Sequence, residues 1–171
     1  AYLLDVENPQ TQLGASSDTF GVRWQGQATS NFTYNLEAAI QQDAGANKDK
    51  EANYSLIEGT YTLNPLSFTL GYEVLGSDDG TYGFSTPLAT LHGFQGWADK
   101  LTATPLNGLE DVYGTIGANI YGVQAALTYH KYDSHKNDID LGSEWNVSLS
   151  KKIGSVAWLV KFADYSMGDN N

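Results

Sequence analysis

The chain contains no cysteine, so disulfide bridges, thiolate metal sites and cysteine nucleophiles are all excluded. Basic residues are scarce, because nine Lys and Arg stand against 20 Asp and Glu and leave a formal net charge of −11. The basic residues are scattered and form no stripe, which argues against binding to DNA or RNA. We therefore expect no nucleic acid among the partners of this protein.

The chain also lacks long hydrophobic runs. No stretch approaches the roughly 18 consecutive apolar residues that a membrane-spanning helix needs. A helical membrane protein is therefore excluded. A membrane β-barrel is not excluded, because its strands alternate lipid-facing and lumen-facing residues and so have a low mean hydropathy.

The residue types that are abundant favour strands and turns. The chain has 11 Tyr, four Trp and 18 Gly, against one Met and four Pro, which is typical of β-proteins. Its 171 residues suit one domain, and no change of composition marks a boundary. We therefore expect residues 1–171 to form a single all-β domain.

Apolar and polar residues alternate with the period of a β-strand in many segments. In residues 32–41 the apolar set is Phe32, Tyr34, Leu36, Ala38 and Ile40, and the residues between them are mostly polar. The pattern predicts about nine strands, each with one apolar and one polar face. The other strand-like segments are 2–7, 20–28, 52–63, 66–74, 110–120, 122–133, 144–153 and 156–165.

The predicted connections alternate between long and short. An antiparallel up-and-down meander with this alternation has every short turn at one end and every long loop at the other, as outer-membrane barrels do. The pattern therefore favours a transmembrane β-barrel. The alternative is a soluble antiparallel sheet with one face on a core and the other in solvent. The long connections are 8–18, 43–51, 75–109 and 133–141, and the short ones are 28–30, 64–65, 120–121 and 154–155.

Five segments carry a resemblance to a known family: "GYEVLGSDDG", "FSTPLATLHGFQGWADK", "TPLNGLEDVY", "DLGSEWNVSLSKKIG" and "VKFADYSMGD". In this order they resemble the C-terminal part of alginate-export-family barrels. The resemblance implies a porin-like channel in the lipid of a Gram-negative outer membrane. Members of that family are longer, and single-chain bacterial barrels have an even number of strands. We therefore expect the nine or so visible strands to be part of a larger barrel.

The longest connection contains the unusual segment "STPLATLHGFQGWADK", residues 85–100. Apolar residues at spacings of three predict a short amphipathic helix in this segment. We expect Leu88, Leu91, Phe94 and Trp97 to dock on the barrel wall, and His92, Asp99 and Lys100 to face the channel. Loops of this length that have structure of their own are usually functional. The segment either constricts the mouth of the barrel or caps its rim for stability.

If the apolar faces meet lipid, the polar faces line a channel. Acidic and basic residues are mixed among the candidates, so the lumen is expected to be polar without a single dominant sign. Alginate is a polyanion and would require a basic channel, which argues against alginate itself as the solute. The predicted channel-lining residues are Arg23, Glu37, Glu58, Glu73, Asp111, His130, Glu144, Lys152 and Lys161.

The remaining patterns suggest no catalytic chemistry. Acidic residues cluster at 76–80 and 133–140, in predicted external loops, where Ca²⁺ binding and simple solvation are the two alternatives. We expect no other metal or cofactor and no enzymatic activity, since no Ser-His-Asp order, nucleotide loop or catalytic carboxylate pair can be identified.

The sequence is consistent with two functions. The first is a passive outer-membrane channel for small polar solutes, sugar acids or polysaccharides. The second is a soluble or surface β-sheet protein that binds or adheres through its acidic loops, for which Ca²⁺ binding and simple solvation are the two alternatives.

Overall fold

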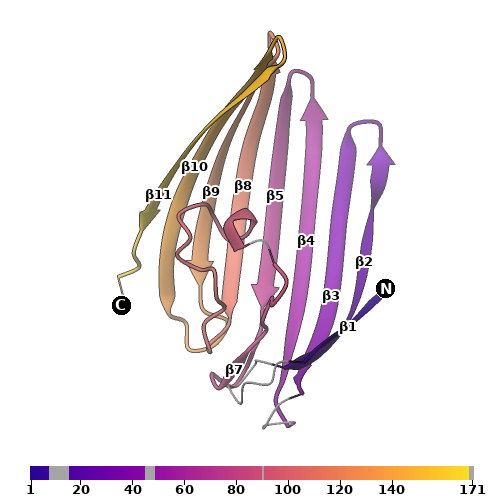
Figure 1. Ribbon diagram of the computed structural model, residues 1–171, viewed down its shortest axis with the longest axis vertical. Helices are drawn as coiled ribbons and strands as arrows, with labels where there is room; N and C mark the ends of the chain where they lie inside the picture. The colour runs from indigo at the N-terminus through magenta and orange to yellow at the C-terminus, as the bar shows by residue number, and fades with distance from the viewer. Residues whose placement is uncertain (8–15, 45–48, 90, 170–171) are drawn as a thin grey trace.

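The computed structural model describes residues 1–7, 16–44, 49–89 and 91–169, and these form an all-β structure. Nine strands make one antiparallel sheet in the order β1-β2-β3-β4-β5-β8-β9-β10-β11 (Figure 1). A two-stranded hairpin, β6 (Ser77–Asp78) with β7 (Tyr82–Gly83), lies within the β5–β8 connection. The strands of the large sheet are β1 (Tyr2–Val6), β2 (Ser17–Thr29), β3 (Phe32–Asp43), β4 (Glu51–Leu63), β5 (Leu66–Leu75), β8 (Leu109–Ile120), β9 (Val123–Asp133), β10 (Asp140–Ile153) and β11 (Val156–Ser166).

The connections follow the predicted alternation. Short turns join β2 to β3, β4 to β5, β8 to β9 and β10 to β11 at one end of the sheet, and the longer connections lie at the other end (Figure 1). The short turns have suitable residues: Tyr121 and Gly122 both have positive φ, 51° and 76°, as a tight hairpin requires. The prediction of a nine-stranded antiparallel meander is therefore confirmed.

The strand register separates the polar and apolar side chains onto opposite faces. Arg23 lies opposite Glu37, and Glu73 lies opposite Asp111, on what we call the polar face. On the opposite, apolar face, Trp24 is 65% exposed and Leu70 is 74% exposed. In the large sheet, each of the eight strands after β1 exposes at least one large apolar side chain on this face: Trp24, Ile40, Ile57, Leu70, Val112, Leu127, Trp145 and Val160.

The buried core lies on the polar face, not on the apolar one. Segment 76–108 folds back across that face and is drawn in front of β8 to β10 in Figure 1. Ring contacts and burial place Tyr82 and Phe84 of this segment against apolar residues at the long-loop ends of the strands. The core cluster is Ala39, Ala52, Leu75, Tyr82, Phe84, Leu109 and Tyr132. Segment 76–108 thus covers the long-loop part of the polar face, while the apolar face is bare. An antiparallel sheet in water usually packs its apolar face and exposes its polar face.

The predicted helix in residues 85–100 is wrong. The described part of this segment contains only a one-turn 3₁₀ element, Leu91–Gly93, and no α-helix. Positive φ angles at Gln95 (50°), Gly96 (83°) and Asp99 (56°) explain the difference, because left-handed residues end a right-handed helix. The segment is a compact irregular loop, and its apolar spacing of three does not reflect a helix.

The described strands do not close into a barrel, since β1 and β11 form the two edges of the sheet. Within the described residues, no helix has the length and apolar character needed to cross a membrane.

Candidate functional site

A cleft of about 370 Å³ lies between the polar face and the loop segment 93–97. Its walls come from strands β2 to β5 and β8 to β10, and Phe94, Gln95 and Trp97 form its lid. Six of the nine predicted channel-lining residues line this cleft: Arg23, Glu37, Glu58, Glu73, Asp111 and His130. The site therefore joins residues that are more than 100 positions apart in the chain.

The strand register explains how these side chains meet. Glu37, Leu56, Glu73 and Asp111 are successive partners across β3, β4, β5 and β8, so they form one row across the sheet. Because partners in an antiparallel pair lie on the same face, every member of the row faces the loop. A second row includes Glu58, Tyr113, His130 and Glu144.

Tyrosine hydroxyls donate to the carboxylates of the cleft. Tyr113 Oη donates to Glu58 Oε2 at 2.6 Å, and Tyr54 Oη donates to Glu73 Oε1 at 2.7 Å. The second carboxylate oxygen of Glu73 accepts from Gln95 Nε2 of the loop at 2.8 Å. Glu73 therefore links the sheet to the loop.

Two of the acidic residues have cationic or titratable partners. Arg23 Nε lies 3.7 Å from Glu37 Oε2 and donates to Asn35 Oδ1 at 2.9 Å. His130 Nδ1 lies 2.9 Å from Asp111 Oδ2, and its ring stacks on Tyr132 with 5.5 Å between centroids. These contacts hold the Asp111 and His130 side chains in place against the wall.

Glu144 anchors the loop through its backbone. The Oε1 atom of Glu144 accepts hydrogen bonds from the backbone N–H groups of Trp97 at 2.5 Å and Ala98 at 2.9 Å. The chain can approach this closely because residue 96 is glycine: a Cβ there would lie 2.4 Å from Tyr132 Oη and 2.5 Å from Glu144 Oε1. The carboxylate and Gly96 together position the lid of the cleft.

The other two predicted lining residues have different surroundings. Lys161 on β11 places its ammonium group 4.1 Å from the centroid of the Trp97 ring, a cation–π contact at the side of the lid. Lys152 lies close to the short β10–β11 turn, on the polar face but outside the cleft. The register thus places all nine predicted residues on one face, and eight of them line the cleft or hold its lid.

The predicted docking of the apolar stripe on the wall is wrong for Leu88, and Phe94 is only partly docked. Leu88 is 71% exposed and Phe94 is 50% exposed, although Phe94 also forms part of the lid. Trp97 is half-buried and does contact the wall, while the side chain of Leu91 lies outside the described residues. The loop binds the wall with polar groups because the face beneath it is polar.

The three residues of segment 85–100 that were predicted to face the channel, His92, Asp99 and Lys100, are exposed. His92 Nδ1 lies 2.9 Å from Asp99 Oδ1, and both side chains are about half exposed. Lys100 is exposed as well. None of the three lines the cleft beneath the lid.

The predicted lining residues did not include several contributors to the cleft, among them Tyr54, Gln95, Tyr113 and Asn146. Their positions could have identified Tyr54 and Asn146, because each lies an even number of residues from a predicted lining residue of its own strand, Glu58 or Glu144. Gln95 belongs to the irregular loop, whose path no periodic pattern describes.

The buried side chain of Gln41 holds the β5–β8 connection against the sheet. Gln41 Oε1 accepts from Tyr82 Oη at 3.0 Å and from the backbone N–H of Ser85 at 2.7 Å. Burial, together with the nearby Asp43 charge, raises the pKa of Tyr82 to about 12, so its hydroxyl remains a donor at neutral pH. The hairpin β6–β7 is therefore tied to β3.

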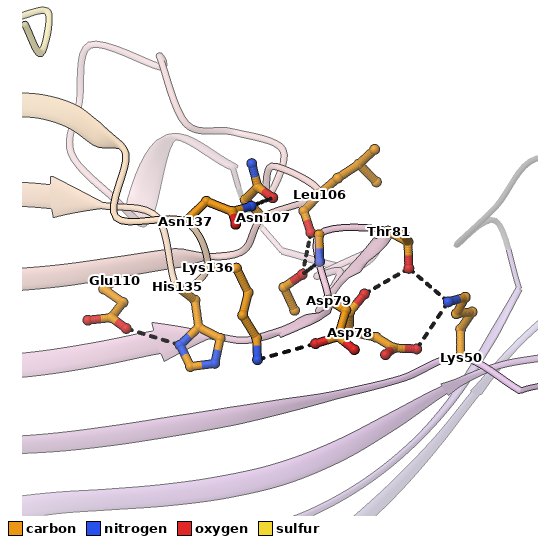
Figure 2. A network of polar contacts seen from close by, with 12 residues as sticks. Lys50, Asp78, Asp79, Thr81, Leu106, Asn107, Glu110, His135, Lys136 and Asn137 are labelled. Carbon is orange, nitrogen blue, oxygen red and sulfur yellow. Dashed lines mark hydrogen bonds and ion pairs between the residues drawn. The ribbon is translucent and has the colours of Figure 1, made fainter. Parts of the chain in front are cut away.

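A second network joins three of the long connections at the outer end of the loops. Figure 2 shows Lys50 reaching Asp78, and Lys136 reaching Asp79, with N–O distances of 3.5 Å and 3.6 Å. In the same view, His135 lies 3.0 Å from Glu110 Oε1. These contacts connect the β3–β4, β5–β8 and β9–β10 loops into one rim.

The same network bears on the expected Ca²⁺ sites in the acidic loops. Lys50 and Lys136 neutralise acids of segment 76–80, and Lys131 forms ion pairs with Asp133 and Asp140. Among the described residues, no three His, Cys, Asp or Glu side chains are grouped so that they could hold a metal ion. In this structure, acidic residues of both loops form ion pairs with lysines.

Comparisons of the chain with family models, with curated proteins and with solved structures give no match.

We predict that Glu144→Gln loosens the lid without unfolding the sheet. Hydrogen bonds to a charged acceptor contribute about 1.5–3 kcal/mol and neutral ones about 0.5–1.5 kcal/mol, so opening should become easier by about 1–2 kcal/mol. The amide hydrogens of Trp97 and Ala98 should exchange about 5–30 times faster. Glu51→Gln, an exposed change on the opposite face, is the control and should leave that exchange rate unchanged. Equal exchange in both variants would contradict the anchoring role of Glu144.

Proposed function

We propose that this protein is a channel of a Gram-negative outer membrane, in which the nine-stranded sheet forms part of a larger β-barrel and conducts small polar or carbohydrate solutes. The observation that carries the proposal is the reversed distribution of polarity. The apolar face is bare and the polar face holds the loop and the cleft. A barrel wall has this arrangement, because lipid covers its apolar exterior and the polar interior surrounds the solute path.

The alternation of connections supports the same proposal. The strands of the large sheet from β2 to β11 have 10–14 residues, enough to reach the roughly 9–11 residues that a tilted strand needs to cross a bilayer. Short turns at one end and structured loops at the other match the periplasmic and external sides of such barrels. The resemblance of five segments to the alginate-export family agrees with this orientation.

Within that proposal, segment 85–100 constricts the channel. Its lid residues lie over the polar face and not beside it, and Gln95, Trp97 and Ala98 all hydrogen bond to carboxylates of the wall. A loop held over the polar face at these points narrows the solute path, and its two carboxylate anchors lie two residues (Glu73) and four residues (Glu144) inside the long-loop ends of β5 and β10.

The proposal is tested with the full-length protein in planar lipid bilayers. We expect stepwise ion conductance and permeation of small sugars in liposome swelling, with a size limit set by the loop. We also expect the protein to need detergent to remain monodisperse, because lipid is the natural cover of the apolar face. A monodisperse protein in plain buffer that forms no conductance steps would favour the soluble binding or adhesive protein instead.

We predict that Trp97→Ala makes the open current noisier. The Trp97 ring contacts Lys161 and the cleft, and a large aromatic anchor contributes strongly to such contacts. Removing it should raise the frequency of brief current fluctuations by a factor of about 10 or less, since a contact of about 1 kcal/mol is lost. Leu88→Ala, at an exposed position, is the control and should leave the noise unchanged.

A further inference from the structure

The cleft beneath the lid carries an excess of negative charge that its own side chains do not neutralise. Glu37 has Arg23 beside it, and Asp111 has His130. Glu58 and Glu73 differ, because within the described residues they accept hydrogen bonds only from the uncharged groups of Tyr54, Gln95 and Tyr113. Among the residues that the structure describes, the carboxylates of Glu58 and Glu73 therefore form no ion pair.

The buried amide of Asn146 also has no partner in the cleft. Asn146 lines the cleft, is 1% exposed, and neither its Oδ1 nor its Nδ2 makes a hydrogen bond. An unpaired buried polar group costs about 1–3 kcal/mol, so such a group marks a position where a ligand or a water completes the site. This observation is independent of the acidic residues and points to a polar ligand.

Aromatic rings complete the lining and have a matching electrostatic preference. Tyr54, Tyr113, Phe94 and Trp97 all line the cleft. The faces of such rings attract cations, and the chain itself provides an example, because the ammonium group of Lys161 lies 4.1 Å from the Trp97 centroid. Aromatic rings beside carboxylates without counter-charges form a combination that binds organic cations.

We propose that the cleft is a binding subsite for a small solute that carries an ammonium group. Glu58 and Glu73 supply the opposite charge, the rings of Tyr54 and Tyr113 contact the cation, and Asn146 Oδ1 accepts an N–H hydrogen bond. The volume of about 370 Å³ lies at the lower end of the range of small-molecule sites. This inference rests on the proposed channel function and names the class of solute that the channel selects.

The test compares block of the potassium current by 1,4-diaminobutane with block by 1,4-butanediol, an uncharged molecule of the same length. We expect the diamine to block at a concentration at least about 10-fold lower than the diol, a preference of about 1.4 kcal/mol or more. Glu58→Gln and Glu73→Gln, made separately, should each raise the half-blocking concentration of the diamine several-fold. Asn146→Ala should raise it as well, and Glu51→Gln should not.

Circular dichroism establishes whether each variant is folded, and two Glu variants are used because Glu73 also holds the loop through Gln95. Equal block by the diamine and the diol in a conducting channel would overturn the subsite and leave the channel function standing. Without conductance the channel function fails, and calorimetric titration of the protein in detergent with 1,4-diaminobutane then decides the subsite. Binding that Glu58→Gln weakens would support it, and no binding would overturn it.

Discussion

Deleting residues 85–100 should raise the single-channel conductance by a factor of about two or more and relax the discrimination between solutes of different size. The deletion removes the lid residues Phe94, Gln95 and Trp97 and opens the cleft that they cover. The strands need not change, because the segment contributes none to the large sheet. Planar-bilayer recording and liposome swelling with sugars of increasing size measure the two effects.

The deletion also separates the two roles that the sequence left open for this segment. A constriction and a stabilising cap differ in what is lost when the segment is removed. Unchanged conductance together with a lower unfolding temperature would reject the constriction and identify a cap. Glu144→Gln provides a milder comparison, since it keeps every loop residue and removes only the charge that accepts the N–H groups of Trp97 and Ala98.

Replacing Val147 with arginine should destabilise the protein in a bilayer by about 2–4 kcal/mol, the cost of a charged residue at the midplane of a barrel's lipid face. Val147 lies near the middle of β10, and its cross-strand neighbours Leu127 and Phe162 are exposed and apolar. The arginine would therefore enter hydrocarbon with no polar partner nearby. Denaturant unfolding of the protein from lipid vesicles measures the change in free energy.

The matched control is Ser148→Arg, one residue further along the same strand. Ser148 lies on the polar face, opposite Lys161 and Ala126, where an arginine can remain hydrated. We expect a cost below about 1 kcal/mol at this position. Small costs at both positions would mean that water covers both faces, and a larger cost at Ser148 would mean that the lipid-facing side has been misassigned.

The strands and their two faces could be predicted from the sequence because they depend on local, periodic information. Successive strand residues point to opposite faces, so the alternation around Phe32, Tyr34 and Leu36 defines both the strand and its orientation. The turn residues Tyr121 and Gly122 mark a strand end in the same local way. Consequently the lengths of the connections could also be predicted, and with them the order of the strands in the antiparallel sheet.

The grouping of the charged residues was predictable only in part. Alternation places Glu73, Asp111 and Glu144 on one face, but it does not say which of them meet across the sheet. The register decides that Glu73 faces Asp111, and it depends on how neighbouring strands slide relative to one another. The sequence therefore predicted that the residues of the cleft share one face of the sheet, but not which of them lie close enough to form a site.

The loop shows where tertiary structure decided the outcome against a local pattern. Spacings of three among Leu88, Leu91, Phe94 and Trp97 resembled a helix, but in the folded chain Gly96 adopts positive φ and fits against Tyr132. The Glu144 carboxylate accepts hydrogen bonds from two backbone N–H groups, which in a helix would donate to backbone carbonyl groups. By itself the sequence determined the strands, their order and their two faces, because these follow from a repeat of two residues. The tertiary structure alone decided the path of the loop, because that path depends on a carboxylate 46 residues away along the chain from the N–H group it binds.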